Sequence, residues 1–405
     1  MVFSAIERIS GVQWRAQGPA FLVAGGHSGI HWIIATIYIL LPFIREDLGL
    51  SYTEAGSLIT IFHTAALFAN VGSGAIVDIT GQRVLTQVAS LLLGGIALTL
   101  IGLAKDFWIL AILLVFVGLT HNLWHPAAIA YLSRKYPKNR GYSLSLHTLG
   151  ASLGDTIAPL FAGLLLVWFP WQEAASFSAL PVFAVAFALF MILGREDEVD
   201  RRIDGTQSSM RLKDYLLELV GLFKDRAIVG LCIMAGFRSM CQNGLLVYLP
   251  MLLKNIFGFG PVLLGTALTV MQIGGMISGP LAGIVSDKAG RRPVVLVGLV
   301  ASTLIVFSFT LTMDPIVVFV MLGLLGFFLF AVRPVIHGWA MDLTPSQMHG
   351  SGVSLLFGTQ SAFSLLVPVL AGLVADTWGL SAVFYGLAGA MFVATVLTFL
   401  MPKNR

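Results

Sequence analysis

Seven of the eight histidines in this chain lie within long apolar segments, where an ionisable side chain costs roughly 2.5 kcal/mol or more. Two pairs stand four residues apart, His27 with His31 and His121 with His125, which places each pair on one helix face. Because histidine titrates near neutral pH, a pair facing a water-filled cavity can couple proton movement to substrate binding. The same spacing suits a metal ion or a metal chelate, and neutral histidines can also simply hydrogen-bond between helices. We expect the proton-coupling role, with no bound metal and no cofactor.

Asp155 is the one acidic residue that the sequence places deep within an apolar segment. A buried carboxylate is costly and a bound proton removes that cost, so we expect Asp155 to carry the coupling proton. The alternative is that Asp155 pairs with a histidine or an arginine and only holds two helices together. His63 and His147 have no partner at the four-residue spacing and fit a structural role better.

Arg238 and Arg333 are two further charges within apolar segments. The planar guanidinium group suits a carboxylate or a phosphate, so the pair predicts an anionic or zwitterionic substrate. Each arginine could instead hold a helix C-terminus or an acidic residue. Other side chains that we expect to contact the substrate are His337, Asn122, Trp124, Gln242, Gln272 and Gln360.

The composition requires these residues to be positioned by membrane-spanning helices. The chain has 405 residues, of which 57% are hydrophobic and 11% charged, whereas an ordinary soluble domain has about 25% charged residues. Apolar runs recur almost from end to end, which excludes a disordered chain, a coiled coil and a disulfide-stapled secreted domain. The runs do not alternate with a period of two, so they predict helices rather than an outer-membrane barrel.

The apolar runs predict an all-α polytopic membrane protein with twelve transmembrane helices in two six-helix pseudo-repeats. An N-terminal bundle over 1–194 and a C-terminal bundle over 227–405 are joined by a cytoplasmic linker over 195–226. The predicted helices cover 19–44, 54–77, 84–104, 107–133, 141–168, 173–194, 227–253, 261–286, 293–313, 315–341, 350–377 and 380–402.

Lysine and arginine residues set the predicted orientation of these helices. Of the 24 in the chain, 19 fall in the termini, the linker and the loops on one side, and three in the opposite loops. Both termini are therefore expected in the cytoplasm, in a bacterial-type inner (plasma) membrane.

A duplicated motif supports the two halves. Gly74-x3-Asp78-x2-Gly81-x-Arg83 recurs 209 residues later as Gly283-x3-Asp287-x2-Gly290-x-Arg292. Pairs such as Pro159 with Pro368 keep the same offset. Glycine permits a tight turn and close helix packing, and the aspartate can pair with nearby basic residues or cap a helix. Parallel repeats with a midplane cavity are typical of secondary transporters.

These loops resemble the signature loops of the major facilitator superfamily, and the resemblance covers the whole chain. It implies the major facilitator fold, in which two six-helix bundles rock about a central site under a gradient. It also implies a gating role for Gly74, Asp78, Gly81, Arg83, Gly283, Asp287, Gly290 and Arg292.

The helix over 141–168 contains Gly154-Asp-Thr-Ile-Ala158-Pro159-Leu-Phe-Ala162-Gly163. This segment is similar to the antiporter motif of the superfamily, with two of its glycines replaced by alanine. Its small residues also fit ordinary close packing between helices. Together with the histidine motifs, it resembles the fosmidomycin-resistance branch, whose members export small drugs or anions using protons.

We therefore expect a proton-coupled secondary transporter that works by alternating access and exports a small anionic or amphiphilic organic compound. Proton-coupled uptake of an organic anion is the alternative, and transport of a metal chelate a further one. The expected partners are the substrate, protons and the lipid bilayer, with no nucleic acid and a monomeric state. An intramembrane metalloenzyme, a sensor and a lipid flippase are rival interpretations, and the duplicated loops favour a transporter that is not an enzyme.

Overall fold

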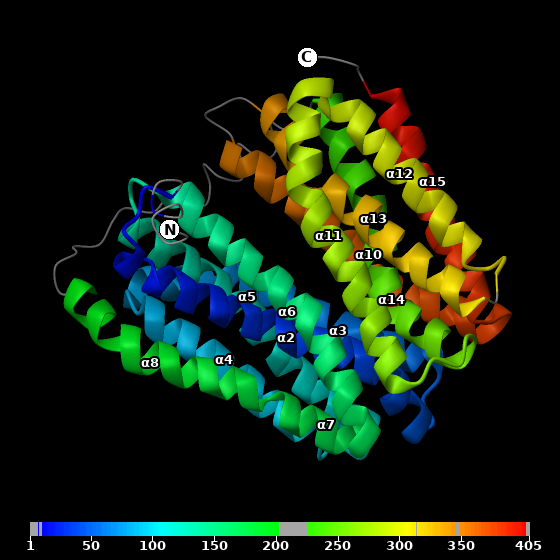
Figure 1. Cartoon of the computed structure of the whole chain (residues 1–405), viewed down its shortest axis with the longest axis horizontal. Coiled ribbons are helices and arrows are strands. Elements are labelled where there is room, and N and C mark those ends of the chain that lie inside the picture. The colour runs from blue at the N-terminus through cyan, green and yellow to red at the C-terminus, as the bar shows by residue number, and fades with distance from the viewer. Residues whose placement is uncertain (1–6, 8–9, 202–224, 313, 345–348, 402–405) are drawn as a thin grey trace. The chain divides into compact units, whose positions relative to one another are not determined.

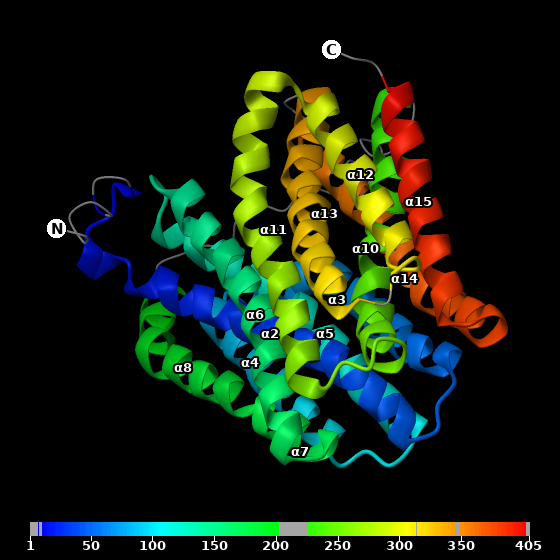
Figure 2. The ribbon, with the colours of Figure 1, turned by 45° about the vertical axis from the view of Figure 1, so that its right-hand side comes forward.

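The computed structural model describes residues 7, 10–201, 225–312, 314–344 and 349–401. Within these residues the long elements are all α-helices, and no strand occurs among them. A short 3-10 helix, η1 (Trp14–Ala16), precedes α2 (Gly18–Asp47), α3 (Tyr52–Thr80), α4 (Arg83–Ile101), α5 (Phe107–Lys135), α6 (Arg140–Trp168), α7 (Trp171–Ser178) and α8 (Leu180–Arg201) (Figure 1). The later helices are α10 (Arg226–Asn255), α11 (Pro261–Ala289), α12 (Arg291–Ser308), α13 (Pro315–Leu343), α14 (His349–Trp378) and α15 (Leu380–Leu400) (Figure 2).

Most of these helices are long enough to cross a bilayer. Helices α5 and α13 have 29 residues each, or about 43 Å at 1.5 Å per residue, against a hydrocarbon core about 30 Å thick. Among the described residues, ten segments are long and apolar enough to span a membrane, with α7 and α8 counted together. Helices α3 and α10 fall outside this set, and α10 carries Arg238, Gln242 and Asn243 near its middle. The predicted all-α membrane fold is confirmed.

The helix predicted over 173–194 is two helices, α7 and α8, with Ala179 between them. Pro181 lies in the first turn of α8. Because proline has no amide hydrogen, it cannot donate to the carbonyl four residues earlier, and the helical ladder is interrupted there. The prediction of one continuous helix was wrong in this detail.

The internal duplication extends to the way in which helices begin. Asp106 caps α5 by accepting hydrogen bonds from the amides of Trp108 and Ile109, at 2.9 and 3.0 Å. Asp314 caps α13 in the same way, with the amide of Ile316 at 2.8 Å. A side-chain oxygen that satisfies these otherwise unpaired amides fixes the helix start. The two caps are 208 residues apart, so they follow the offset of the sequence repeat.

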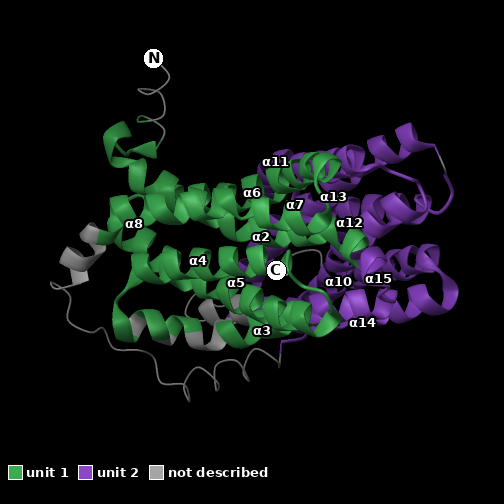
Figure 3. Ribbon diagram, turned by 90° about the horizontal axis from the view of Figure 1, so that it is seen from below, with its two compact units in different colours: residues 1–44, 61–207 green, residues 45–60, 208–405 purple. Residues whose placement is uncertain are grey.

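The chain folds into two compact units (Figure 3). Unit 1 comprises residues 1–44 and 61–207, and unit 2 comprises residues 45–60 and 208–405. Within unit 1, α4 packs against α5 and α8; within unit 2, α10 packs against α14 and α15, and α11 against α13. Most of the predicted linker lies in 202–224, outside the described residues.

The segment 45–60 is held in unit 2 by the end of α14. The Asp376 carboxylate accepts hydrogen bonds from the amides of Tyr52 and Thr53, at 2.8 and 2.9 Å, and from the Thr53 hydroxyl at 2.6 Å. A Cβ atom built on Gly372 would lie 2.6 Å from the Thr53 Cα atom, so the two backbones touch. The first turn of α3 is thus capped by a residue more than 300 positions later in the chain.

Glycine is required where α11 turns into α12. Gly290 has φ 90° and ψ 157°, a conformation that is essentially confined to glycine. Gly81, its counterpart in the first motif, has φ 63°. Gly283 differs, because it lies inside α11 and a Cβ atom built on it would meet no atom within 4 Å.

We predict that Gly290→Ala lowers the free energy of unfolding by about 1–3 kcal/mol, because alanine is strained at this φ and ψ. Gly283→Ala is the matched control, and it should leave stability unchanged or raise it by roughly 0.5–1 kcal/mol. Denaturant unfolding of the purified proteins in detergent measures both. Equal stability of the two variants would contradict the assigned turn.

Candidate functional site

Helices α2 and α6 approach each other until their backbones touch. A Cβ atom built on Gly150 would lie 2.0 Å from the Ala24 carbonyl oxygen, and one on Gly154 would lie 2.3 Å from the Ser28 carbonyl oxygen. Any larger residue would force the helices apart, so the glycines of α6 fix this contact. The contact brings side chains that are more than 100 residues apart in sequence within hydrogen-bonding distance.

The first such pair is His27 on α2 and His147 on α6. Their rings stack with centroids 3.7 Å apart and planes at 14°, and His27 Nδ1 lies 2.6 Å from the His147 carbonyl oxygen. The indole nitrogen of Trp124 donates to His147 Nε2 at 3.2 Å. Because indole is only a donor, His147 Nε2 accepts, and the neutral ring carries its proton on Nδ1.

The second pair is His31 on α2 and Asp155 on α6. His31 Nδ1 lies 3.1 Å from both carboxylate oxygens of Asp155. The two side chains are 21% and 30% exposed, so the pair is only partly buried. Asp155 lies near the middle of α6, and its carboxylate is partly exposed rather than fully buried. The pairing with a histidine is the contact that the sequence left as an alternative.

Helix α5 adds His121 and His125 to the same cluster. The His125 ring lies 5.1 Å from that of His27, and the His121 ring 5.3 Å from that of His31, between centroids. His125 Nδ1 lies 3.0 Å from the His121 carbonyl oxygen, one turn earlier in the helix. Both predicted histidine pairs therefore meet in unit 1.

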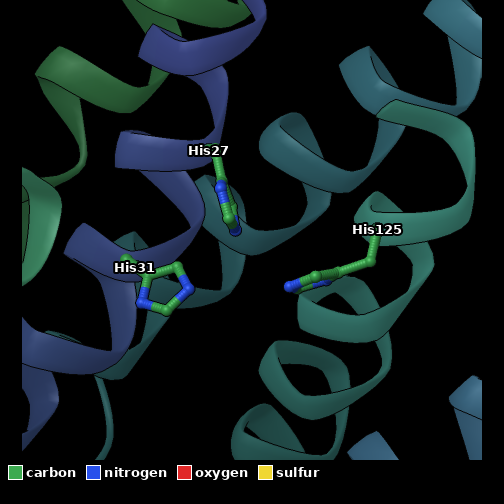
Figure 4. A group of neighbouring side chains, drawn as sticks. All are labelled: His27, His31 and His125. Carbon is green, nitrogen blue, oxygen red and sulfur yellow. The ribbon is translucent and has the colours of Figure 1, made fainter. Parts of the chain in front are cut away.

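Three of these histidines converge on a common point. One ring nitrogen from each of His27, His31 and His125 lies within 4.8 Å of the other two. Figure 4 shows the His125 ring of α5 directed towards the two rings of α2. His27 Nε2 is buried and has no hydrogen-bond partner among the described residues.

Sequence reasoning missed the part played by His147. Its spacing from Gly150 and Gly154, three and seven residues, places it on the face of α6 that touches α2. That spacing was the available signal.

Two residues predicted to touch substrate have other partners in unit 1. Trp124 is 0% exposed and supports His147, so its predicted contact with substrate does not fit this geometry. The amide nitrogen of Asn122 donates to the Ala66 carbonyl oxygen at 2.6 Å and ties α5 to α3.

The predicted cations lie in unit 2 and differ in exposure. Arg238 is only 3% exposed, and its Nη2 donates to the Leu329 carbonyl oxygen of α13 at 2.7 Å. Arg333 is exposed, and it is close enough to Arg238 and His337 for their charges to interact. The His337 ring lies 5.0 Å from that of Phe357 on α14. Arg333 is thus the better placed of the two to meet a ligand from outside the unit.

The predicted amides of unit 2 lie on three helices. Gln242 on α10, Gln272 on α11 and Gln360 on α14 are all partly exposed. Gln242 Oε1 is buried without a hydrogen-bond partner among the described residues. Asn243, the neighbour of Gln242, instead donates to the hydroxyl of Ser364 at 2.8 Å and so joins α10 to α14.

The second signature loop contains an ion-pair network that centres on Arg291. Its Nη1 lies 2.5 Å from Asp287 and its Nε lies 2.9 Å from Asp342 on α13. Arg292, the arginine of the motif, donates to the Thr398 and Phe399 carbonyl oxygens of α15. The two adjacent arginines therefore hold different helices, since Arg291 points towards α13 and Arg292 towards α15.

The first signature loop is described only in part. Gly74 lies in α3 with open space around it, and Arg83 begins α4. The side chain of Asp78 lies outside the described residues.

We predict that Trp124→Phe lowers the free energy of unfolding by about 1–3 kcal/mol, because His147 Nε2 loses its donor while buried. Trp108→Phe is the matched control, since Trp108 is 73% exposed and should tolerate the change. Denaturant unfolding in detergent compares the two variants. An unchanged Trp124→Phe protein would contradict the supporting role of the indole.

Comparison of the sequence with protein-family models identifies one matching family. The profile of the Major Facilitator Superfamily matches residues 23–265 and 231–405. A putative metabolite transport protein of Haemophilus influenzae is 25% identical over 407 residues, covering 98% of each chain. The sialic acid transporter NanX of Escherichia coli is 23% identical over 89% of this chain and 86% of the relative. The multidrug resistance protein MdtG of Escherichia coli is 22% identical over 90% of each.

Solved structures share the fold at low sequence identity. A bacterial homologue of the human lysosomal transporter Spinster, in an inward-facing and occupied conformation, gives a TM-score of 0.76 at 15% identity and covers 95% of this chain and 96% of its own. The nucleoside transporter NupG gives 0.77 at 14% identity, covering 96% of this chain and 100% of its own. The chain therefore belongs to the Major Facilitator Superfamily, and it is a multi-pass membrane transporter of small molecules rather than an enzyme.

Proposed function

We propose that this protein is a proton-coupled secondary transporter that works by alternating access and exports a small anionic or amphiphilic organic compound. The observation that carries the proposal is the His31–Asp155 pair, a partly exposed carboxylate 3.1 Å from an imidazole within a histidine cluster. A carboxylate and an imidazole in hydrogen-bonding contact are two groups that can each accept and release a proton, so the pair suits proton coupling.

Further histidines of three helices lie around this pair. Helix α2 contributes His27, α5 contributes His121 and His125, and α6 contributes His147. We assign proton coupling to Asp155 together with His27, His31, His121 and His125. Helix α5 itself contains no acidic side chain, and Asp155 supplies the carboxylate that contacts His31.

Substrate recognition is assigned to the cations of unit 2. Arg333 is exposed, while Arg238 is buried and bonded to α13, so Arg238 adds positive charge without direct contact. A carboxylate or phosphate is the group that an exposed guanidinium binds best. His337, Gln242, Gln272 and Gln360 are the further polar groups of this surface. Asn122 is the corresponding candidate of unit 1.

Gating is assigned to the two signature loops. The Arg291 network joins Asp287 at the end of α11 to Asp342 at the end of α13. Breaking it would free the two helix ends to move apart. By the repeat, Gly74, Asp78, Gly81 and Arg83 take the corresponding role in the first loop. In the second loop, Gly290 shapes the turn, Gly283 lies within α11 before it, and Arg292 holds α15.

Export is preferred because Pro159 and the small residues after Gly154 resemble the antiporter motif, and because MdtG is named for multidrug resistance. NanX is named as a sialic acid transporter, which makes proton-coupled uptake of an organic anion the second candidate. We propose a monomer in a bacterial inner membrane. The distribution of lysine and arginine supports an orientation with both termini in the cytoplasm.

We predict that purified protein releases protons when an exported substrate binds, and that Asp155→Asn abolishes this release. The panel comprises small organic anions, phosphonates and cationic drugs, added near neutral pH in weakly buffered detergent with a pH indicator. Asp314→Asn is the matched control, because asparagine caps a helix as well as aspartate. Proton uptake on binding would favour import, and binding without any proton change would contradict coupling.

We predict that Arg333→Ala weakens the binding of an anionic substrate at least about tenfold, the value of one hydrogen bond to a charged group. Arg333→Lys should retain part of the affinity, since it keeps the charge but loses the planar fork. Titration calorimetry with the anion identified in the panel measures both. Unchanged affinity in Arg333→Ala would leave this arginine a structural residue.

A further inference from the structure

We propose that His27, His31 and His125 form a binding site for a divalent transition-metal ion of the zinc class. The three residues come from α2 and α5 of unit 1, and their ligand nitrogens lie within 4.8 Å of one another. The assignment depends neither on the direction of transport nor on its coupling to protons.

The strongest support is the second layer of contacts around the three rings. His27 Nδ1 faces the His147 carbonyl oxygen at 2.6 Å, and His125 Nδ1 faces the His121 carbonyl oxygen at 3.0 Å. His31 Nδ1 faces the Asp155 carboxylate at 3.1 Å. Carbonyl and carboxylate oxygens only accept, so each neutral ring carries its proton on Nδ1 and its lone pair on Nε2. This arrangement, with Nδ1 held by an oxygen and Nε2 presented as a ligand, is the usual one for metal-binding histidine.

His27 supplies an independent observation. The residue is only 5% exposed, and its Nε2 is buried with no hydrogen-bond partner in the described residues. A buried acceptor that is left unsatisfied costs about 1–3 kcal/mol. A metal ion at the meeting point of the three rings would satisfy this nitrogen.

The distances allow the site to close by ring rotation. A zinc–nitrogen bond of about 2.0–2.1 Å in a tetrahedral site sets nitrogens about 3.4 Å apart. The ligand nitrogens of the three histidines now lie within 4.8 Å of one another, which is somewhat wider than this tetrahedral separation. His31 is 21% exposed and so has room to turn towards the other two rings.

The ligand set selects the kind of ion. Three imidazoles suit zinc, copper or nickel, whereas calcium and magnesium prefer oxygen ligands. The Asp155 carboxylate contacts His31 Nδ1, the ring nitrogen that does not bind the ion. It therefore orients the ligand from outside the coordination sphere and partly balances the charge of the ion. Three protein ligands leave a fourth position open to water or to an anion. The site thereby fits the metal-chelate substrate that the sequence offers as an alternative.

Titration calorimetry of the full-length protein in detergent with Zn²⁺ tests the assignment. We expect one ion per chain, loss of that binding in His125→Ala, and an affinity lowered about 10–100-fold in Asp155→Asn. His63→Ala is the matched control: it removes a histidine of α3 outside the three ligands and should bind as the original protein does. Mg²⁺ should not bind.

A second measurement keeps the test decisive if His125→Ala fails to fold. Co²⁺ bound to the unmodified protein should show the visible absorption of a nitrogen-ligated four-coordinate site, and Asp155→Asn should alter that spectrum. Absence of stoichiometric Zn²⁺ binding to the folded protein would overturn the proposal, as would binding that is undiminished in folded His125→Ala. Substrate-driven proton release is measured separately in chelator-treated protein, so the metal site and proton coupling can fail independently.

Discussion

The close approach of α2 and α6 is the constraint on which the candidate site depends. At Gly150 and Gly154 the α6 backbone touches carbonyl oxygens of α2, and no side chain larger than hydrogen fits between them. In an apolar membrane, polar side chains must find partners within the protein, and this contact supplies them. It sets His27 against His147 and His31 against Asp155. A proton site and a metal site both follow from the same helix contact, because each needs these rings held at fixed distances.

The two units hold opposite kinds of chemistry. Unit 1 gathers neutral imidazoles around one carboxylate, which suits protons or a metal cation. Unit 2 carries the buried Arg238 and the exposed Arg333, whose guanidinium groups suit an anion. The Arg238 guanidinium is held by a hydrogen bond to α13, and the second signature loop is held by the Arg291 network. A protein that moves an anion together with a compensating charge needs both kinds of surface.

Periodicity and duplication predicted the helices well, because apolar runs and repeated glycines are local signals. The break at Ala179 was missed since Pro181 lies in a continuous apolar run. The histidine pairs were recognised from their four-residue spacing. A contact between Asp155 and a histidine was only one of two alternatives, because it joins residues 124 positions apart and depends on how closely two helices pack. The different partners of Arg291 and Arg292 could not be predicted from the sequence for a similar reason, since adjacent residues on a helix point about 100° apart.

The account's central claim is that the His31–Asp155 pair couples a proton to transport. Its most direct test compares two activities of protein in liposomes, using a compound from the panel that releases protons. The account predicts that Asp155→Asn still exchanges this compound across the membrane but no longer accumulates it against a gradient when a pH difference is imposed. Accumulation by Asp155→Asn equal to that of the original protein would contradict the claim. Loss of both exchange and accumulation in a folded Asp155→Asn protein would contradict it as well.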